Sequence, residues 1–130
     1  MSEACILLVE GDILIRTPLA EYLRECGYRV VEAAAASEAR ELLVHGTIPV
    51  DIVMIAVSAE ERSGFELATW VRSNTPGCEV VLAGTLAKAA QKAGDLCEEG
   101  PALGRPYDHK FVLEHIKRLM AARQRDKSDK

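Results

Sequence analysis

The side chains best suited to thiol and metal chemistry are widely spaced in this sequence of 130 residues. None of the four cysteines belongs to a C-x-x-C pair, and none has a histidine at the spacing of a zinc finger. A free cysteine behaves as a small apolar residue, so we predict buried, reduced thiols rather than disulfides or metal ligands. The four residues are Cys5, Cys26, Cys78 and Cys97.

The histidines and hydroxyl groups give no stronger sign of catalysis. His45, His109 and His115 fall at a helix end or on the polar side of the last helix, and none has a second ligand at suitable spacing. We therefore expect them at the surface. Ser58 and Thr85 are chemically able to accept phosphate from a kinase, but no activating base accompanies either residue. These groups predict no catalytic residue and no enzyme activity.

The composition is typical of one compact domain, with 48% hydrophobic and 28% charged residues. A net charge of -4 argues weakly against nucleic acid as a partner, because phosphate binding depends on clustered Lys and Arg. The sequence lacks the run of about 18 uncharged apolar residues that a membrane span needs. Residues 1–3 also lack the basic flank of a signal peptide, so we expect a cytoplasmic protein without membrane contact.

Short apolar runs alternate with longer stretches of helical period, which is the pattern of strand–helix units in a parallel sheet. The first, third and fourth runs are almost wholly apolar, as expected for strands covered by helices on both faces. The second run keeps two charged residues and is closer to an edge strand. The fifth run is weak. The five expected strands are Cys5–Val9, Arg29–Glu32, Asp51–Ile55, Val80–Ala83 and Ala102–Gly104.

Several helix ends are recognisable from their capping residues. The first helix either starts late, with Pro18 in its first position, or starts near Ile13 and bends at Pro18; Gly27 then ends it. Ser37 can cap a second helix that ends near Gly46. The remaining expected helices are a third over 63–74, opened by a capping box of Ser63 and Glu66, and a fourth, weakly anchored, over 87–96.

The last helix is amphipathic and can be capped by Asp108. Its apolar residues recur at three- and four-residue steps, so we expect this stripe to face the sheet. The polar residues 124–130 are expected to form a disordered tail after a folded domain of residues 1–123. The stripe consists of Phe111, Val112, Ile116, Leu119 and Met120.

This order of elements predicts an α/β fold of the flavodoxin-like, doubly wound type. Right-handed crossovers leave few topologies, and the natural one is a five-stranded parallel sheet of order 2-1-3-4-5 with five helices. In such sheets the functional groups gather at the carboxyl ends of the strands. The residues that follow strands one, three, four and five are therefore the ones that decide function.

Three segments carry a resemblance to a known family. Ile6-Leu7-Leu8-Val9-Glu10 closes the first strand, Ser63-Gly64-Phe65-Glu66-Leu67 opens the third helix, and Arg105-Pro106-Tyr107 is similar to a Lys-Pro-Phe segment. With the uninterrupted spacing from Ala56 to Gly64, these residues resemble the receiver domains of response regulators in bacterial two-component signalling, over about residues 4–122. The resemblance implies the same flavodoxin-like fold and a phosphoacceptor pocket at the sheet edge.

In a working receiver, two acidic residues bind Mg²⁺, an Asp after strand three accepts phosphate, and a hydroxyl and a Lys contact the phosphoryl group. Here the first acidic position is Glu10 but the second is Gly11, and the phosphoacceptor position is Ala56. A methyl group cannot form an acyl phosphate. The resemblance therefore implies a vestigial pocket with weak or lost magnesium binding and no cofactor.

The two other pocket positions are also changed. The hydroxyl position aligns with Gly84, with Thr85 beside it, and the lysine position is Arg105. Arg105 keeps the positive charge with a larger planar donor group, and we expect it to pair with Glu10 or to turn toward solvent.

We interpret the chain as a receiver-like protein-interaction module that cannot be phosphorylated at the usual position. The resemblance implies protein partners in a two-component pathway, a histidine kinase or another regulator, and allows a homodimer. The family's signalling face corresponds to residues 86–120 and includes Leu103 and Tyr107. Two alternatives remain: phosphorylation of a substitute carboxylate, for which Asp12 is better placed than Asp51, and a pseudo-receiver that senses a small molecule.

Overall fold

A computed structural model describes residues 4–46, 48–56, 61–99 and 108–128. Strands and helices alternate as the sequence pattern predicts, and the first strand has the predicted bounds. In chain order the elements are β1 (Cys5–Val9), α1 (Ile13–Glu25), β2 (Arg29–Ala33), α2 (Ala36–His45), β3 (Ile52–Ile55), α3 (Glu61–Asn74), β4 (Glu79–Leu82), α4 (Leu86–Glu99) and α5 (His109–Ser128).

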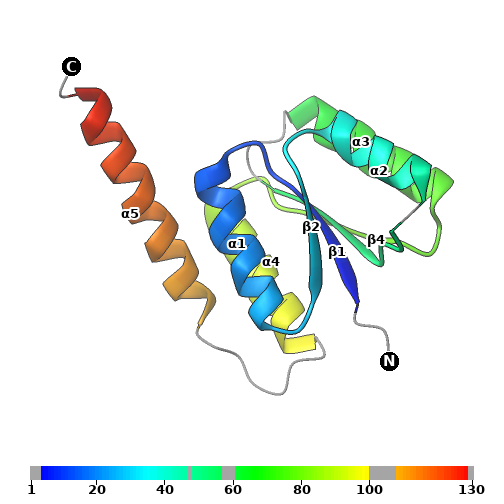
Figure 1. Ribbon diagram of the computed structural model, residues 1–130, viewed down its shortest axis with the longest axis horizontal. Coiled ribbons are helices and arrows are strands. Elements are labelled where there is room, and N and C mark those ends of the chain that lie inside the picture. Colours follow the sequence, from blue (N-terminus) through cyan, green and yellow to red (C-terminus); the bar gives the residue numbers. More distant parts are fainter. Residues whose placement is uncertain (1–3, 47, 57–60, 100–107, 129–130) are drawn as a thin grey trace.

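The described strands form one parallel sheet of order β2-β1-β3-β4, which confirms the predicted fold class and this part of its strand order (Figure 1). The register places Leu7 of β1 beside Val31 of β2 and Val53 of β3. All five residues of β1 are buried, whereas β2 lies at the edge and exposes Arg29. The predicted fifth strand, 102–104, lies outside the described residues.

Helices cover both faces of the sheet (Figure 1). On one face, α2 and α3 pack over Leu7 and Val9 of β1. On the other face, α1 and α4 pack over Ile6 and Leu8. Because alternate residues of a strand point to opposite faces, the apolar run of β1 contributes to both cores.

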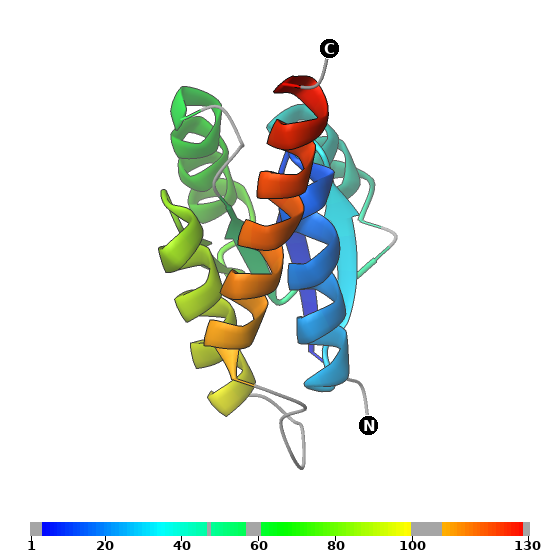
Figure 2. The same ribbon diagram turned by 90° about the vertical axis from the view of Figure 1, so that its left-hand side faces the viewer.

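The last helix does not lie where its apolar stripe predicts. Instead of covering the sheet, α5 packs mainly on α1 and α4 and forms an outer layer (Figures 1 and 2). Val112 and Ile116 are buried in this contact, while Phe111 remains 55% exposed. The reason is that α1 and α4 already cover this face of the sheet, so the stripe of α5 is buried against helices.

Residues 124–128 continue α5, so the expected disordered tail is wrong for this part of the chain. No Pro or Gly interrupts the sequence between His109 and Ser128, and most of these residues are good helix formers. Polar composition alone was therefore a poor indicator of disorder here.

The helix starts also differ in part from the predictions. The early start of α1 is confirmed: Asp12 is its N-cap, its side chain accepts a hydrogen bond from the Leu14 N–H, and Pro18 lies inside the helix. Ser37 is not a cap, because it lies inside α2, which begins at Ala36, and no side chain caps that helix. Ser63 lies inside the first turn of α3, so the predicted capping box does not open that helix.

The predicted ends of the first three helices agree with the structure. α2 ends at His45 and is followed by its C-cap Gly46, which has a left-handed φ of 64°, and Gly27 follows α1 with a φ of 97°. Glycine tolerates this conformation because it has no Cβ to clash with the backbone. The predicted end of α3 at Asn74 is also confirmed.

The prediction of four reduced cysteines is wrong for two of them. Cys26, at the end of α1, and Cys97, in the last turn of α4, form a disulfide with a Cα–Cα distance of 5.4 Å. Packing of both helices on one face of the sheet brings these residues together. Cys5 and Cys78 are free, and burial raises the pKa of both thiols.

The predicted weak anchoring of α4 is also wrong. Small side chains at Ala89, Ala90 and Ala93 are fully buried, and they allow α4 to lie close to its neighbours. The Tyr28 hydroxyl, beyond the end of α1, donates a buried hydrogen bond of 2.5 Å to the Leu96 carbonyl. α4 is thus held by packing, by this bond and by the disulfide. Within the described residues, no helix combines the length and the apolar character that a bilayer span requires.

Candidate functional site

The carboxyl ends of three neighbouring strands meet at one edge of the sheet. The backbone ladder continues one residue past each strand: the Ala56 N–H donates to the Val9 carbonyl at 2.8 Å, and the Ala83 N–H donates to the Ile55 carbonyl at 2.9 Å. Glu10 follows β1 in the same way and donates to the Ala33 carbonyl at 3.0 Å. The structure therefore brings Glu10, Ala56 and the chain just before Gly84 to one edge, as the fold predicts.

Glu10 is fully buried and already engaged by its own loop. Its Oε2 atom accepts a hydrogen bond of 2.6 Å from the Asp12 N–H, and its carbonyl accepts one of 2.9 Å from Arg16 Nη1. Arg16 also pairs with Glu32 of β2 at 3.1 Å. A charge-assisted bond from the backbone is a strong structural contact, so the Glu10 carboxylate fixes the turn between β1 and α1.

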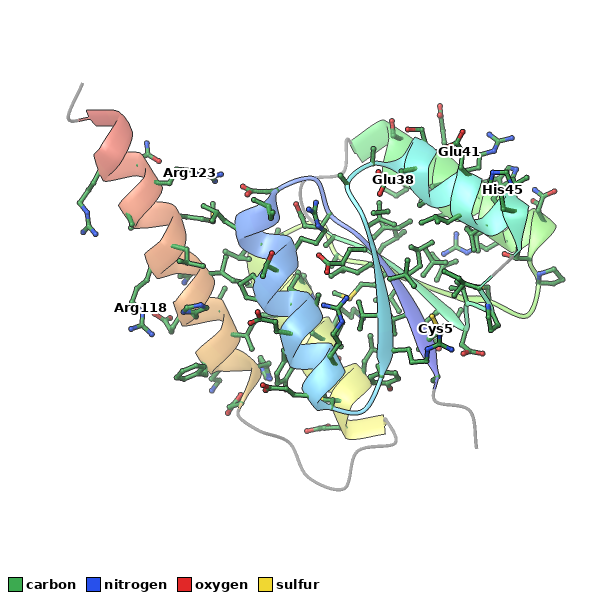
Figure 3. The ribbon with its side chains drawn as sticks, in the orientation of Figure 1. Cys5, Glu38, Glu41, His45, Arg118 and Arg123 are labelled. Atoms are coloured by element: carbon green, nitrogen blue, oxygen red, sulfur yellow. A yellow bond between two sulfur atoms is a disulfide. The ribbon has the colours of Figure 1, made fainter. Side chains whose placement is uncertain are left out.

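Asp12 is bound from two sides. Its Oδ1 atom accepts from the Leu14 N–H at 2.9 Å, and the Arg123 guanidinium reaches both carboxylate oxygens, at 2.7 and 3.2 Å. The hydrogen bond from Arg123 has the largest effect on the pKa of the Asp12 carboxyl. Together with the bond from Leu14, it lowers this pKa although partial burial raises it. Asp12 is therefore held ionised and faces α5. Figure 3 shows Arg123 on the helix that carries it.

Arg123 was not among the residues that the sequence singled out as candidates for the site. Its partner lies 111 residues away in the chain, and no short-range pattern marks such a pair. The placement of α5 over α1 brings the two together.

Two further positions of the pocket, Ala56 and Gly11, have no side-chain oxygen. Ala56 is only 4% exposed, and its side chain belongs to the core beneath α1 and α4. Gly11 is exposed and has no side chain. Gly64 packs closely against β3, because a Cβ at this position would lie 3.2 Å from Ile55 Cγ2. This explains a glycine at the start of α3 without any role in catalysis.

These residues do not fit a magnesium ion. Mg²⁺ requires an octahedral set of oxygens and usually one or two carboxylates. At this edge the Glu10 carboxylate bonds its own loop, and the Asp12 carboxylate is paired with Arg123. Over the described parts of the chain, no three His, Cys, Asp or Glu side chains gather in a way suited to a metal ion.

The hydroxyl of Thr85 has a structural role. Its Oγ1 atom accepts a hydrogen bond of 3.1 Å from the Lys88 N–H and so caps the start of α4. Gly84, which precedes it, is exposed, and a Cβ built on Gly84 would meet nothing within 4 Å.

Three predicted site residues, Arg105, Leu103 and Tyr107, lie outside the described residues. The pairing of Arg105 with Glu10 therefore stays a prediction. Asp51 lies at the opposite end of the sheet, as expected, where its Oδ2 atom accepts a hydrogen bond of 2.8 Å from the Cys5 N–H.

Two of the histidines, His45 and His115, are exposed, as the sequence predicts. His109 is partly exposed, and its Nδ1 atom lies 3.3 Å from Asp108 Oδ1. It also packs closely against Gly94 of α4.

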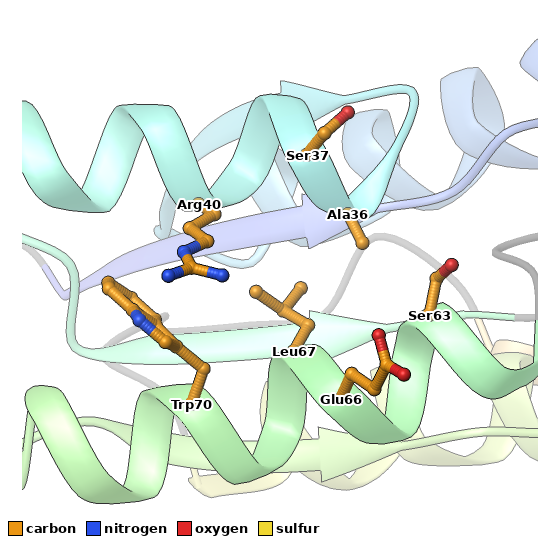
Figure 4. A pocket seen from close by; sticks show the side chains of 7 residues that line it. All are labelled: Ala36, Ser37, Arg40, Ser63, Glu66, Leu67 and Trp70. Atoms are coloured by element: carbon orange, nitrogen blue, oxygen red, sulfur yellow. The ribbon is translucent and has the colours of Figure 1, made fainter.

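A second feature, absent from the sequence analysis, lies between α2 and α3. The Arg40 guanidinium lies over the ring of Trp70, 5.0 Å from its centroid, and this pair borders a hollow of about 250 Å³ (Figure 4). Arg40 and Trp70 belong to different helices, so no local pattern in the sequence signals their contact. The groove runs along the two helices, and its end at Ala36 and Ser63 lies where both helices begin, beyond the carboxyl ends of β2 and β3.

Comparison with known proteins gives a consistent family. Residues 6–100 match the model of the response regulator receiver domain. Over 75 residues the chain is 31% identical to a cyclic di-GMP phosphodiesterase of Thermotoga maritima; the match covers 58% of this chain and only 19% of that protein. The chain thus spans about a fifth of the length of this relative.

Solved structures with the same fold include the signal receiver domain of an HD domain-containing protein from Pseudomonas fluorescens Pf-5. It is 23% identical, with a TM-score of 0.59 and coverage of 95% of this chain and 98% of that one. The chemotaxis response regulator CheY4 of Vibrio cholerae is 23% identical, with a TM-score of 0.56 and coverage of 90% and 98%. With a family model that matches well over half of its length, this chain belongs to the response regulator receiver domain family.

Proposed function

We propose that this receiver domain is a regulatory module that acts through protein contacts and takes no phosphate at the usual aspartate position. Receiver domains of two-component systems are regulatory and interact with kinases or other regulators. The observation that carries the proposal is Ala56, whose methyl group stands directly after β3 and is packed into the core. Acyl phosphate formation needs a carboxylate oxygen as nucleophile, and this position offers none.

The surrounding charges support the same proposal. Glu10 and Asp12 are described carboxylates that follow β1 at this edge, and both already serve as acceptors for donors of the protein itself. Without a metal ion and a free carboxylate, the charge of a transferring phosphoryl group would find little compensation here. The domain would then occupy one conformational state, or shift toward the state that a partner binds better.

The test of this proposal is exposure of the protein to Mg²⁺ and a small phosphodonor such as acetyl phosphate, followed by intact mass measurement. We expect the mass to stay unchanged. A receiver domain that carries the usual aspartate, treated in parallel, shows that the donor is active. Gain of one phosphoryl group by this chain would overturn the proposal.

The alternative of a substitute acceptor concerns Asp12. Its carboxylate binds the Leu14 N–H and both terminal nitrogens of the Arg123 guanidinium, which lowers its nucleophilicity and turns it toward α5. A phosphate mapped to Asp12 and abolished by Asp12→Asn would favour this alternative. A small-molecule sensor is the other alternative; a rise in thermal stability with a nucleotide or another signalling metabolite would favour it.

The partners are proposed to be a histidine kinase or another regulator of a two-component pathway, with a homodimer as a further possibility and a cytoplasmic location. The family's usual signalling face corresponds to residues 86–120, which include α4 and the first part of α5. The disulfide between Cys26 and Cys97 argues against a cytoplasmic location, because reducing compartments rarely maintain disulfides. Alkylation of free thiols in intact cells, before lysis, would measure how much of the protein carries this bond.

A further inference from the structure

The groove between α2 and α3 presents an arginine in a fixed orientation. The Arg40 guanidinium lies 5.0 Å from the centroid of the Trp70 ring, with one residue on each helix (Figure 4). Stacking on an aromatic ring is favourable for a planar guanidinium and restricts its motion. A restricted guanidinium loses less entropy when it binds a carboxylate, so this pair is prepared for recognition.

Two hollows flank the Arg40–Trp70 pair. One, of about 250 Å³, lies between the helices and is lined by Leu67 and Ser63. The other, of about 450 Å³, runs along α3 and is lined by Phe65. Arg40 and Trp70 line both hollows, so the pair forms a ridge between them. A ridge with a depression on each side suits a chain that lies across it with a side chain in each depression.

Large apolar groups are exposed around the same ridge. Phe65 is 58% exposed. Trp70, the single tryptophan of the chain, is partly exposed. Val44, one helical turn after Arg40 on α2, is 63% exposed. Trp and Arg are enriched among the residues that dominate binding energy at protein interfaces. The surface therefore combines an apolar contact area with one oriented cation.

The charge around Arg40 restricts the chemistry of a partner. Within the described part of the chain, no carboxylate lies within ion-pair distance of Arg40, whereas Arg16, Arg24 and Arg123 each have one. Glu66 lines both hollows, so a densely acidic segment would be repelled. A single carboxylate beside apolar side chains matches this distribution.

We propose that the α2–α3 groove is a docking surface for a segment of a partner protein that presents one Asp or Glu flanked by apolar side chains. The carboxylate pairs with Arg40 in bidentate geometry, and the neighbouring apolar side chains fill the two hollows beside Trp70. This inference rests on the proposed function only in requiring that the domain acts through protein contacts. It places such a contact on a face opposite to α4 and α5 (Figure 1).

Trp70 provides the measurement, because its fluorescence reports on the groove alone. The probes are acetylated and amidated ten-residue peptides in which one Glu stands between Leu and Phe residues. Matched peptides carry Gln in place of Glu, or four Glu residues. We expect the first set to change Trp70 emission saturably, and the Gln and polyacidic peptides to bind about tenfold more weakly or less, as loss of one charged contact typically causes.

Two matched variants test the role of Arg40. Arg40→Gln should weaken binding of the one-Glu peptides about tenfold, whereas Arg72→Gln should leave it within about twofold. Arg72 is the proper control because it is an exposed arginine of α3 that does not line either hollow. Circular dichroism melting of both variants shows whether either has lost its fold; if Arg40→Gln fails to fold, Arg40→Lys keeps the charge without the planar group and should also lose affinity.

Three results would overturn the proposal: no saturable change with any one-Glu peptide, equal binding of the Gln peptides, or equal loss in both variants. Concentration-dependent self-association that Arg40→Gln abolishes would assign the groove to a second copy of this chain and would also overturn it. None of these results depends on the phosphodonor experiment, so the two proposals fail separately.

Discussion

At the scale of single residues, one carboxylate connects three parts of the chain. Asp12 caps α1 through the Leu14 N–H, binds Arg123 of α5, and donates its own N–H to Glu10. In a receiver this turn is expected to supply acidic metal ligands, whereas here its acidic groups hold the loop and the last helix. The same residue types therefore serve structure at a position where the family resemblance implies chemistry.

The cap can be separated from the ion pair by two substitutions. Asn retains the capping ability of Asp12 but loses its charge, whereas Ala loses both. We expect Asp12→Ala to be about 1 kcal/mol less stable than Asp12→Asn, because that is the usual contribution of a polar N-cap. Urea unfolding measures the difference. Equal stability of the two variants would show that α1 does not depend on this cap.

The ion pair predicts a dependence on pH. Arg123 holds the pKa of the Asp12 carboxyl below its ordinary value in the folded protein. A depressed folded-state pKa stabilises the protein above the unfolded-state pKa, and this stability is lost as the pH falls through the folded value. The stability difference between wild type and Asp12→Asn should therefore be constant near neutral pH and shrink below about pH 4.

Urea unfolding of both proteins at a series of pH values tests this, with Arg123→Gln as a companion variant. That variant removes the guanidinium and leaves the carboxylate, so its own difference from wild type should shrink over the same range. A difference that persists unchanged at the lowest pH would contradict the ion pair.

At the scale of elements, the position of α5 depends on close packing against α4. Val112 and Ile116 are buried between α5 and its neighbours, and His109 lies against Gly94, which has no side chain. A Cβ at Gly94 would come within 2.7 Å of His109 Nδ1 and 2.9 Å of His109 Cβ. Since the Cβ is fixed to the backbone of α5, relief requires a shift of that helix.

Gly94→Ala therefore sets two effects against each other. Ala stabilises a helix interior by about 1 kcal/mol relative to Gly, whereas overpacking costs about 1 to 3 kcal/mol. We expect a net loss of stability and faster amide hydrogen exchange in α5 than in wild type. Gly94→Ala combined with His109→Gly removes the clash and should restore slow exchange. A stabilised single variant would show that α5 is less closely packed.

At the scale of the whole molecule, the disulfide connects two helices that are distant in sequence. Cys26 and Cys97 are separated by 71 positions, and the loop between them contains most of the sheet. A bond of this kind restricts the unfolded chain over the whole loop. Together with the Tyr28–Leu96 hydrogen bond, it holds the end of α4 against the end of α1.

Chain-entropy arguments give about 4 kcal/mol for a loop of this length, with engineered disulfides often contributing less. We expect the variant with both Cys26→Ser and Cys97→Ser to be less stable than wild type by an amount up to this value, measured by urea unfolding without reductant. Reductant should destabilise wild type and leave the double variant unchanged. Four free thiols in the denatured, unreduced protein would show that the bond does not form.

The sequence by itself determined the order of the described elements and the placement of Glu10 and Ala56 after β1 and β3. The apolar runs of β1 and β3 and the turn glycines Gly27 and Gly46 are short-range signals, and the structure agrees with them. The identity of Ala56 and its place after β3 likewise follow from residue order, because strand ends and register are local properties.

The tertiary structure alone decided which distant groups meet. The Asp12–Arg123 pair, the disulfide, the Arg40–Trp70 pair and the outer position of α5 join residues that no periodicity relates. Hydrophobic patterning specifies that a helix face must be buried, but it does not specify the surface that buries it. That choice depends on how α1 and α4 share one face of the sheet, and it brings together the Asp12–Arg123 pair and the Cys26–Cys97 disulfide.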